Sequence, residues 1–485
     1  MFRFYEVGSD TFPWFTNRLS KYNYPLDVSF YMINESVSTK SFIDQISQLT
    51  QLKSVQIHGG KLKQDVESEY WYKLSSLHSI QGWIVDEPWP LDLLKEFPNL
   101  KQIRTPNPTP FHNASKIEQL IADISDTSDV IESLPNSLHS LTLNFIDETF
   151  EDHDLNYLTN LTDLDLSGSF RYSGEIDVRD ITSLRSLKFT NLNVDGFSNC
   201  TNLTELLINR DVYDFENIID AIGEMRSLER LEKLTLSEPV HCNRGTNPFA
   251  IYSRLTFLDA NVSGDLSLLP DTIRHLVITI HGQFEIESLA HLTELKHLEI
   301  CSLPQTSAKA SKYGNLLNQL TQLKYLKVAA DRLRLPSISK LTDLEQLTLT
   351  GVTLNADDYY HLTNLKRLKI SYAELPEESW NTFSHLKKLT YLENYYLFSG
   401  AETILDYNAI ANLPLRTLIC RPHIKELNLF ESLAKMTDLR YLELLEIAHA
   451  DQFTMLTHLQ HLRQMLVTNN VEEVRIRHLR AIQMN

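Results

Sequence analysis

The sequence predicts an α/β solenoid in which short coils stack side by side and each coil adds one strand to a common parallel sheet. Three observations lead to this prediction. A leucine frame of the form LxxLxxLxL returns along the 485 residues, for example at Leu158–Leu166 and Leu341–Leu349. Leucine supplies 78 of the 485 residues, about 16%, whereas the 14 glycines fall below the usual share of roughly 7%. The last two leucines of the frame alternate with polar residues, as a strand with one buried face requires.

The copies of the frame follow one another closely enough to form consecutive coils. We take the second leucine of each frame as position 1, so that positions 4 and 6 are the buried strand residues. Position 1 then falls at residues 52, 77, 100, 138, 161, 184, 203, 231, 255, 273, 295, 323, 344, 365, 389, 415, 439 and 459, with weaker copies at Ile117 and Val471. One coil cannot bury its leucines alone, so neighbouring coils must stack.

With the Ile117 copy included, the mean interval is about 22.6 residues, within the roughly 20–29 residues typical of leucine-rich repeats. The sequence resembles that family over about residues 45–480. The resemblance implies a horseshoe-shaped solenoid with a parallel concave sheet and short convex helices or 3₁₀ turns. The family usually has Asn at position 9, but here most copies hold other residues, such as Ser169. Two copies, Leu134–Leu141 and Leu269–Leu276, resemble the FNIP variety of the repeat.

The two ends of the chain match the frame poorly and are expected to close the solenoid. Residues 1–45 contain no copy and are rich in aromatic residues, so we expect an N-terminal cap over the first coil. We expect residues 46–470 to form the solenoid and residues 471–485 to form a C-terminal cap. Three prolines within Arg104–Phe111 predict an irregularity or kink in the region 104–137.

Longer intervals between copies leave room for helices on the outer side of the coils. Apolar residues at helical spacing predict helices within residues 215–225 and 313–320. Two shorter helices are expected at Trp380–Phe383 and Ile404–Leu405, and a surface loop is expected at Cys242–Pro248.

The composition points away from nucleic acid and from membranes. The chain has 45 Lys and Arg against 63 Asp and Glu, a formal net charge of −18 at pH 7. This balance disfavours binding to nucleic-acid phosphates and to anionic membranes. The sequence has no run of about 18 apolar residues that could span a bilayer, and its first residues lack the apolar core of a signal peptide. We therefore expect a cytoplasmic protein.

Candidate catalytic and metal-binding motifs are better explained by the repeat. His291, His361 and His385 occupy one repeat position in three coils, and no HExxH or CxxC spacing accompanies them. Asp163–Ser167 matches the DxDx[ST] nucleophile motif of haloacid-dehalogenase phosphatases, but its polar residues are positions 3, 5 and 7 of one strand. The four cysteines are too scattered for a disulfide scaffold or a zinc cluster. We therefore expect no catalytic residue, no metal site and no cofactor.

The polar faces of the strands offer the best candidate binding surface, because positions 3, 5 and 7 point outward from the sheet. In the later copies these positions carry tyrosines together with side chains of both charges. Tyrosine and arginine dominate binding hot spots, since they bury a large area and still form hydrogen bonds. The alternative is that tyrosine, with 20 copies, is simply common and tolerated on exposed strands. The predicted partner-binding residues are Tyr325, Lys327, Arg367, Lys369, Tyr391, Glu393, Tyr395, Arg421, Tyr441, Glu443 and Arg463, with Phe257, His275, His297 and Glu299 extending the stripe toward the middle of the chain.

The resemblance and this surface together predict a non-catalytic module or scaffold for protein–protein interaction, whose partner binds the concave face. Two alternatives remain open. One is an effector with leucine-rich repeats that an intracellular bacterium or a large virus delivers into a host cell. The other is the substrate-receptor subunit of a ubiquitin ligase, although residues 1–45 show no convincing F-box. The sequence names neither the partner nor the oligomeric state.

Overall fold

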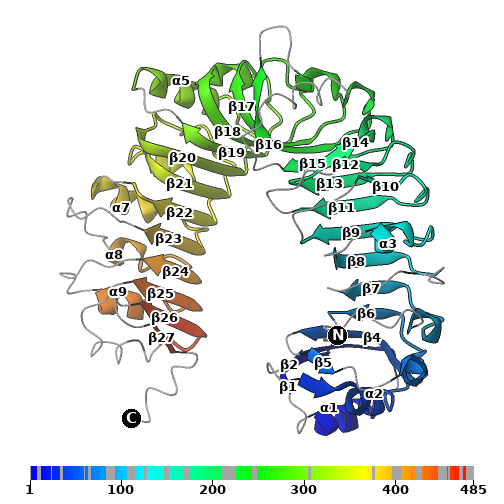
Figure 1. Ribbon diagram of the computed structural model, residues 1–485. Coiled ribbons are helices and arrows are strands. Elements are labelled where there is room, and N and C mark those ends of the chain that lie inside the picture. The colour runs from blue at the N-terminus through cyan, green and yellow to red at the C-terminus, as the bar shows by residue number, and fades with distance from the viewer. Residues whose placement is uncertain are drawn as a thin grey trace. The chain divides into compact units, whose positions relative to one another are not determined.

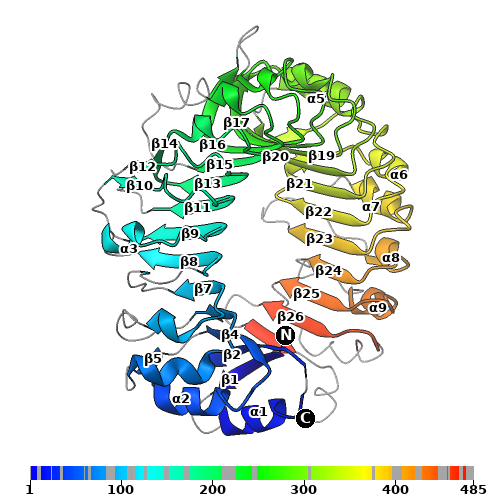
Figure 2. The same ribbon diagram turned by 90° about the vertical axis from the view of Figure 1, so that its right-hand side faces the viewer.

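The computed structural model describes residues 2–7, 12–22, 24–32, 36–58, 61–63, 67–82, 93–105, 111, 116–124, 128–146, 152–168, 175–209, 225–242, 248–303, 307–373, 377–395, 407–420, 429–445, 456, 459–468 and 473–476. The chain forms two compact units, residues 1–238 and 239–485, which we call unit 1 and unit 2. In each unit a parallel sheet runs through the consecutive coils (Figure 1, Figure 2). The α/β repeat architecture predicted from the leucine frame is therefore confirmed.

In the main sheet of unit 1, every strand pairs in parallel with the next. The strands are β1 (Phe2–Val7), β2 (Leu26–Met32), β4 (Leu52–His58), β6 (Ser79–Gln81), β7 (Gln102–Thr105), β8 (Gln119–Ile124), β9 (Ser140–Phe145), β11 (Asp163–Ser167), β13 (Ser186–Thr190), β15 (Glu205–Asn209) and β16 (Lys233–Cys242), whose last four residues belong to unit 2. Smaller parallel sheets are formed by β3 (Ser36–Ser38) with β5 (Lys61–Lys63), and by β10 (His153–Asp154), β12 (Glu175–Asp177) and β14 (Asn193–Asp195). The helices are α1 (Phe12–Leu19), α2 (Thr39–Ile46) and α3 (Ser128–Glu132), with 3₁₀ turns η1 (Ser68–Leu74), η2 (Leu93–Glu96), η3 (Phe197–Asn199) and η4 (Met225–Ser227).

Unit 2 repeats the same arrangement with longer outer segments. Its parallel strands are β17 (Phe257–Gly264), β18 (His275–Phe284), β19 (His297–Leu303), β20 (Tyr325–Arg334), β21 (Gln346–Thr353), β22 (Arg367–Ser371), β23 (Tyr391–Tyr395), β24 (Thr417–Cys420), β25 (Tyr441–Leu445) and β26 (Gln464–Thr468), followed by the antiparallel β27 (Glu473–Ile476). On the outer side lie α5 (Ser307–Leu317), α6 (Asp358–His361), α7 (Glu377–Phe383), α8 (Tyr407–Ile410) and α9 (Leu429–Ala434), with 3₁₀ turns η5 (Pro248–Ile251) and η6 (Ile286–Leu289). No helix in the described ranges is long and apolar enough to cross a membrane.

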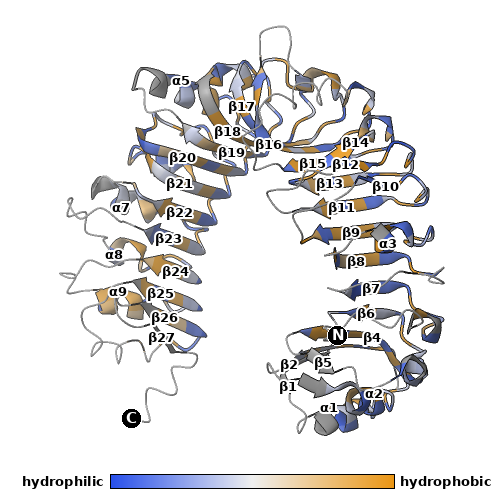
Figure 3. Cartoon of the chain, in the orientation of Figure 1, coloured by the Kyte–Doolittle hydropathy of each residue, from blue (hydrophilic) through white to orange (hydrophobic). Residues whose placement is uncertain are grey.

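Buried and partly exposed side chains alternate along each strand, so the sheet has one buried face and one open face. In β20, Leu326 and Val328 at positions 4 and 6 are buried, as is Leu323 at position 1. Tyr325 and Lys327 at positions 3 and 5 are half-buried on the other side, which we call the open face. Figure 3 shows hydrophobic and hydrophilic residues alternating along the strands. Burial contributes roughly 1.5–3 kcal/mol for each large apolar side chain, so the repeated leucines hold the coils together.

The last copy of the frame lies three residues later than expected. Tyr441 on β25 pairs with Gln464 on β26, which makes Leu462 the position-1 residue of this coil in place of Leu459. Leu456, Leu459 and Leu462 follow one another at intervals of three and are all buried. The leucines alone therefore fit two frames, and only the pairing of the strands decides between them. The weak copy at Ile117, by contrast, is confirmed, because β8 pairs with β7 and β9 in regular register.

In eight coils, a hydrogen bond from the side chain of the residue just before position 1 connects the coil to the preceding one. Where that residue is asparagine, its side-chain amide donates to a backbone carbonyl: Asn99 to Ser75, Asn160 to Asn136, Asn202 to Thr182 and Asn364 to Thr342. Where it is serine or threonine, the hydroxyl donates to the position-1 carbonyl of the preceding coil, as in Ser76, Ser137, Ser183 and Thr272. These bonds supply the links between coils that the missing asparagines at position 9 would have made.

The remaining element predictions have mixed outcomes. The helix expected within 313–320 is present as α5, although it begins at Ser307 and ends at Leu317, and the one at Trp380–Phe383 is part of α7. The helix predicted at 404–405, most of the helix predicted at 215–225 and the centre of the 242–248 loop lie outside the described residues. The cap boundaries and the kink at 104–137 stay predictions. β1 and β2 continue the sheet beyond the first coil, and β7 pairs with β8 without a register shift.

Candidate partner-binding face

Most of the predicted binding residues lie on the open face of unit 2. Nine of the eleven occupy positions 3, 5 or 7 of four strands: Tyr325 and Lys327 on β20, Arg367 and Lys369 on β22, Tyr391, Glu393 and Tyr395 on β23, and Tyr441 and Glu443 on β25. Arg421 lies outside the described residues. The prediction that Arg463 occupies position 5 of a strand is wrong, because the shifted frame places it at position 2, exposed, just before β26.

Two tyrosines of this face are oriented by glutamates two residues further along their own strands. The Tyr391 hydroxyl donates a hydrogen bond to Glu393 Oε2, and the Tyr441 hydroxyl donates to Glu443 Oε2 at 2.7 Å. Residues two apart on a strand share a face, so each ring must lie along its strand. The same motif therefore occurs on β23 and on β25, with β24 between them.

The tyrosine on β23 also contacts a cation on the neighbouring strand. The Arg367 guanidinium carbon lies 4.1 Å from the centre of the Tyr391 ring, a cation–π contact. Burial, the hydrogen bond to Glu393 and the charge of that carboxylate raise the pKa of Tyr391. Burial and the charges of Glu443 and Glu393 raise the pKa of Tyr395 to about 12. Both phenols therefore keep their protons at neutral pH and remain hydrogen-bond donors.

Four aromatic side chains at position 3 of β17 to β20 form one continuous stack. The ring centres are separated by 4.5 Å between Phe257 and His275, 3.6 Å between His275 and His297, and 3.9 Å between His297 and Tyr325. The last two pairs are nearly parallel, with interplanar angles of 11° and 4°. The sequence pattern places these residues on one stripe, but only the in-register parallel pairing brings each ring against the next.

The carboxylate of Glu299, at position 5 of β19, accepts hydrogen bonds from Lys327 and from His297, which is one of the stacked rings. Glu299 Oε2 accepts from Lys327 Nζ at 2.8 Å, and Glu299 Oε1 accepts from His297 Nε2 at 3.0 Å. Burial alone would raise the pKa of Glu299, but these two hydrogen bonds outweigh it and lower the pKa. Burial lowers the pKa of His297, and burial together with the neighbouring His297 lowers the pKa of His275 to about 4. The two stacked imidazoles are therefore neutral at pH 7.

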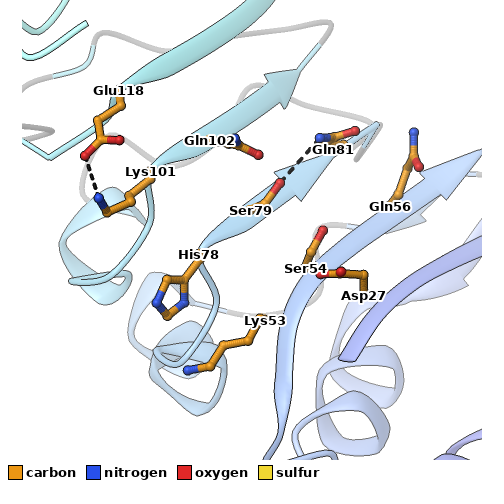
Figure 4. A pocket seen from close by; sticks show the side chains of 10 residues that line it. All are labelled: Asp27, Lys53, Ser54, Gln56, His78, Ser79, Gln81, Lys101, Gln102 and Glu118. Atoms are coloured by element: carbon orange, nitrogen blue, oxygen red, sulfur yellow. Dashed lines mark hydrogen bonds and ion pairs between the residues drawn. The ribbon is translucent and has the colours of Figure 1, made fainter. Parts of the chain in front are cut away.

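Unit 1 has a polar hollow of about 420 Å³ on its open face, which the sequence analysis missed (Figure 4). Ser54 and Ser79 occupy position 3 here, where unit 2 has aromatic rings, so the short side chains leave the space unfilled. Lys101 at the rim forms an ion pair with Glu118 at 2.6 Å. The amide, hydroxyl and charged groups of the lining suit a polar molecule. The complete lining is Asp27, Lys53, Ser54, Gln56, His78, Ser79, Gln81, Lys101, Gln102 and Glu118.

The histidines and cysteines that might suggest a metal site have structural surroundings. Across the described ranges, no group of three or more His, Cys, Asp or Glu side chains could hold a metal ion. The ring nitrogens of His291 lie 2.9 Å from the Ser288 carbonyl oxygen and 2.8 Å from that of Leu269, so this side chain connects two coils. Burial raises the pKa of Cys200 and of Cys242 to about 12, which leaves both thiols protonated and unreactive.

Comparisons with known proteins support the fold. No family model matches the sequence, and neither does any curated protein. Among solved structures, TLR13 in its complex with ssRNA13 is 17% identical with a TM-score of 0.54, over 94% of this chain and 79% of that chain. An internalin of Listeria monocytogenes is 18% identical (TM-score 0.38; 79% and 89% covered), and a leucine-rich-repeat protein of Leptospira interrogans is 17% identical (TM-score 0.38; 86% and 91% covered).

Proposed function

Because this chain has the leucine-rich-repeat fold, we propose that it is a non-catalytic binding module that holds a partner protein on the open face of unit 2. The observation that carries the proposal is the group formed by Arg367 on β22, Tyr391 and Tyr395 on β23, and Tyr441 on β25, all on one face of the sheet. All four side chains are partly exposed or exposed, and all four lie on strands of the parallel sheet. Tyrosine and arginine are the residues that most often dominate the binding energy of protein interfaces.

The hydrogen bonds to Glu393 and Glu443 fix the orientation of the Tyr391 and Tyr441 side chains before a partner binds. Tyr391 and Tyr441 are already held by Glu393 and Glu443, so they lose little conformational freedom when a partner packs on them. Lys369 Nζ lies 2.6 Å from Glu393 Oε1, which balances the charge of that buried carboxylate. From β20 to β26 the face spans roughly 29 Å at ~4.8 Å per strand, enough for an interface of standard size.

The proposal covers several cellular roles that share this surface. A cytoplasmic scaffold, a host-directed effector and a substrate receptor of a ubiquitin ligase would all hold a protein on such a face. They differ in the identity of the partner and in the location of the chain. We favour the scaffold, because the surface cluster accounts for it without a further domain.

A nucleic-acid partner is the competing possibility, because TLR13, which shares the fold, was solved as a complex with ssRNA13. The prediction that this chain does not bind nucleic acid therefore gains no support from the similarity to TLR13. A protein is favoured on charge, since Lys327 and Lys369 are both paired with glutamates and the chain carries a net charge of −18. RNA binding through phosphate contacts would reveal itself by a steep loss of affinity with added salt.

The test is an affinity pull-down from the source cell with the wild type and with Tyr391→Ala/Tyr395→Ala/Tyr441→Ala. The matched control is Tyr24→Ala/Tyr72→Ala/Tyr360→Ala, which removes three exposed tyrosines away from this face. We expect one protein to be retained by the wild type and the control but lost by the first variant, with unchanged thermal melting. Equal retention by all three chains would place the binding site elsewhere, and release by ribonuclease would identify RNA as the partner.

A further inference from the structure

The position-2 residues of unit 2, which immediately precede the strands, form a row of mostly basic residues along one edge of the sheet. Backbone hydrogen bonds connect each of them to the next. Arg440 N donates to the Arg416 carbonyl oxygen at 2.9 Å, and Arg463 N donates to that of Arg440 at 2.8 Å. From β18 to β26, seven of the nine residues at this position are basic. They are Arg274, Lys296, Lys324, Lys366, Arg416, Arg440 and Arg463, and the other two are Glu345 and Thr390.

Two ion pairs show that side chains at position 2 of adjacent coils reach one another. In unit 2, Lys366 Nζ lies 2.7 Å from Glu345 Oε2. In unit 1, Lys101 Nζ lies 2.6 Å from Glu118 Oε1. The two residues of each pair are also joined through their backbones as the position-2 residues of successive coils. In both places, therefore, a basic residue at this position pairs with the acidic residue that the adjacent coil supplies.

The last three coils supply no such acid. Arg416, Arg440 and Arg463, which we call the arginine row, precede β24, β25 and β26, and these strands are neighbours in the sheet (Figure 1). All three side chains are exposed, and none makes an ion pair or a side-chain hydrogen bond with the part of the chain that the structure describes. Arg274, at the other end of the row of position-2 residues, instead donates to two backbone carbonyls of its own coil.

Three adjacent positive charges disfavour the folded chain by itself. Successive position-2 residues are ~4.8 Å apart along the sheet, and like charges opposite each other on neighbouring strands are destabilising. The chain has a formal net charge of −18, so acidic residues are plentiful elsewhere. Asp438, two residues before Arg440, is exposed and makes no ion pair within the described ranges. The arginine row is therefore a local concentration of positive charge that a negatively charged partner would neutralise.

The arginine row adjoins the tyrosines of the open face. Arg440 immediately precedes Tyr441, and Tyr441 N donates a hydrogen bond to the Arg416 carbonyl oxygen at 3.0 Å. A partner that packs on these tyrosines therefore reaches the arginines with its adjoining residues. The row extends over three strands, roughly 9.6 Å at ~4.8 Å per strand, and an extended segment of about four residues covers this length at ~3.3 Å per residue.

The surroundings favour the carboxylates of a polypeptide over the phosphates of RNA. Guanidinium groups form paired hydrogen bonds with both anions. Single-stranded RNA, however, is bound largely through bases that stack on aromatic ring faces. On this face Arg367 covers one side of the Tyr391 ring, and the rings on β18 to β20 are stacked on one another. The net charge of −18 also repels a long polyanion more strongly than a short acidic segment.

We propose that an acidic segment of the partner protein lies along the arginine row and pairs its carboxylates with Arg416, Arg440 and Arg463. This proposal rests on the binding function proposed above and names the chemistry that the partner contributes beside the tyrosines. The ion pair between Glu345 and Lys366 is the same contact within the chain. The partner's carboxylates take the place that an acidic position-2 residue has there.

The test uses the full chain and the capped peptide acetyl-Glu-Asp-Glu-Asp-Glu-Asp-amide, with the neutral peptide acetyl-Gln-Asn-Gln-Asn-Gln-Asn-amide for comparison. Binding is measured at low salt by ligand-observed NMR titration. We expect the wild type to bind the acidic peptide on the order of tenfold more tightly than the neutral one, as three exposed ion pairs predict. Arg416→Gln/Arg440→Gln/Arg463→Gln should lose this preference.

The matched control is Arg104→Gln/Arg185→Gln/Arg226→Gln. It removes the same charge from three exposed arginines of unit 1, one of which, Arg185, also occupies position 2. We expect this control to bind the acidic peptide like the wild type, because the net charge changes equally in the two variants and only the arginine row differs.

Arg440→Glu is a second, single-residue test. It places an acid between Arg416 and Arg463, as Glu345 stands beside Lys366, so the row would pair within the chain. We expect this variant to lose the binding of the acidic peptide and to melt at a higher temperature than the wild type, because the repulsion is relieved. A lower melting temperature would show that Arg440 has a structural role and would count against the proposal.

Other results would overturn the proposal outright. These are equal binding of the two peptides by the wild type, no binding of the acidic peptide, undiminished binding by either variant of the row, and an equal loss in the control. Tighter binding of an oligouridylate than of the acidic peptide would assign the row to phosphates and overturn it as well.

The pull-down with the triple tyrosine variant is separate from these results. A partner lost by that variant, with no binding of the acidic peptide, would leave the binding face in place and remove only the acidic segment. Peptide binding that depends on the arginine row, with no partner lost by the tyrosine variant, would do the reverse.

Discussion

Lys369 on β22 and Glu393 on β23 lie opposite each other on the open face, with Nζ 2.6 Å from Oε1. Glu393 is only 4% exposed although it sits on the face that the sequence predicts to be open. The side chains of Lys369 and Tyr391 cover it and take one carboxylate oxygen each. Glu393, at a position that the sequence predicts to be on the surface, is thus a buried carboxylate with a partner for each oxygen. The positions of the Lys369 and Tyr391 side chains depend on these two contacts.

Removing the lysine should therefore destabilise the protein. Lys369→Met would leave the Glu393 carboxylate buried with only the tyrosine hydroxyl as a partner, and we expect a loss of roughly 2–3 kcal/mol in the free energy of unfolding. Urea denaturation followed by circular dichroism measures it. Lys369→Met/Glu393→Gln should recover part of the loss, because the unpaired charge is gone. If the double variant were less stable than the single one, the pair would not be the cause.

The stacked histidines should make stability depend on pH. The pKa of His275 is lowered to about 4 from an ordinary 6.5, so the unfolded chain binds a proton between these values that the folded chain does not. The contribution is complete above pH 6.5 and is lost as the pH falls toward 4. His275→Phe keeps a ring in the stack without a titrating group. Thermal melting from pH 7 to pH 4 should fall less steeply for this variant, and identical slopes would contradict the assignment.

The side-chain links between coils should contribute measurably to stability. Asn364 donates to the Thr342 carbonyl at 2.9 Å and accepts from Lys388 Nζ at 2.7 Å, so it joins three coils. Asn364→Ala should lower the free energy of unfolding by about 1 kcal/mol. Asn381→Ala, at an exposed site on α7, is the matched control and should have a smaller effect. Equal effects of the two substitutions would argue against a structural role of the link.

One glycine is required by the backbone. Gly351 has a φ of 64°, and a Cβ built on it would lie 1.9 Å from the Ala330 carbonyl oxygen of the adjacent strand. Gly351→Ala should cost about 2 kcal/mol or more, because both the conformation and the contact disfavour a side chain. Gly168→Ala meets mainly the end of the flexible Leu192 side chain and should cost less. Comparison of the two urea midpoints checks the order, and the reverse order would refute the explanation.

The binding face illustrates how far the repeat frame can be followed from sequence. Counting from position 1 correctly assigned Tyr325, Tyr391 and Tyr441 to the open face, because the two-residue period of a strand leaves no other choice. The same count failed for Arg463, since leucines at intervals of three satisfy two frames equally. The binding role of these residues stays a prediction until a partner is tested.

What the sequence determined by itself was the class of fold and the stripe of residues on each face, because burial of a repeated leucine frame has only one stacked solution. What only the tertiary structure decided was which side chains of that stripe meet. Residues such as Arg367, Tyr391 and Thr417 are more than 20 positions apart in the chain and become neighbours only through parallel pairing in exact register. That register also buries Glu393 beside Lys369 and stacks the rings of β17 to β20. Contacts across strands depend on the geometry of the whole sheet, which no local pattern contains.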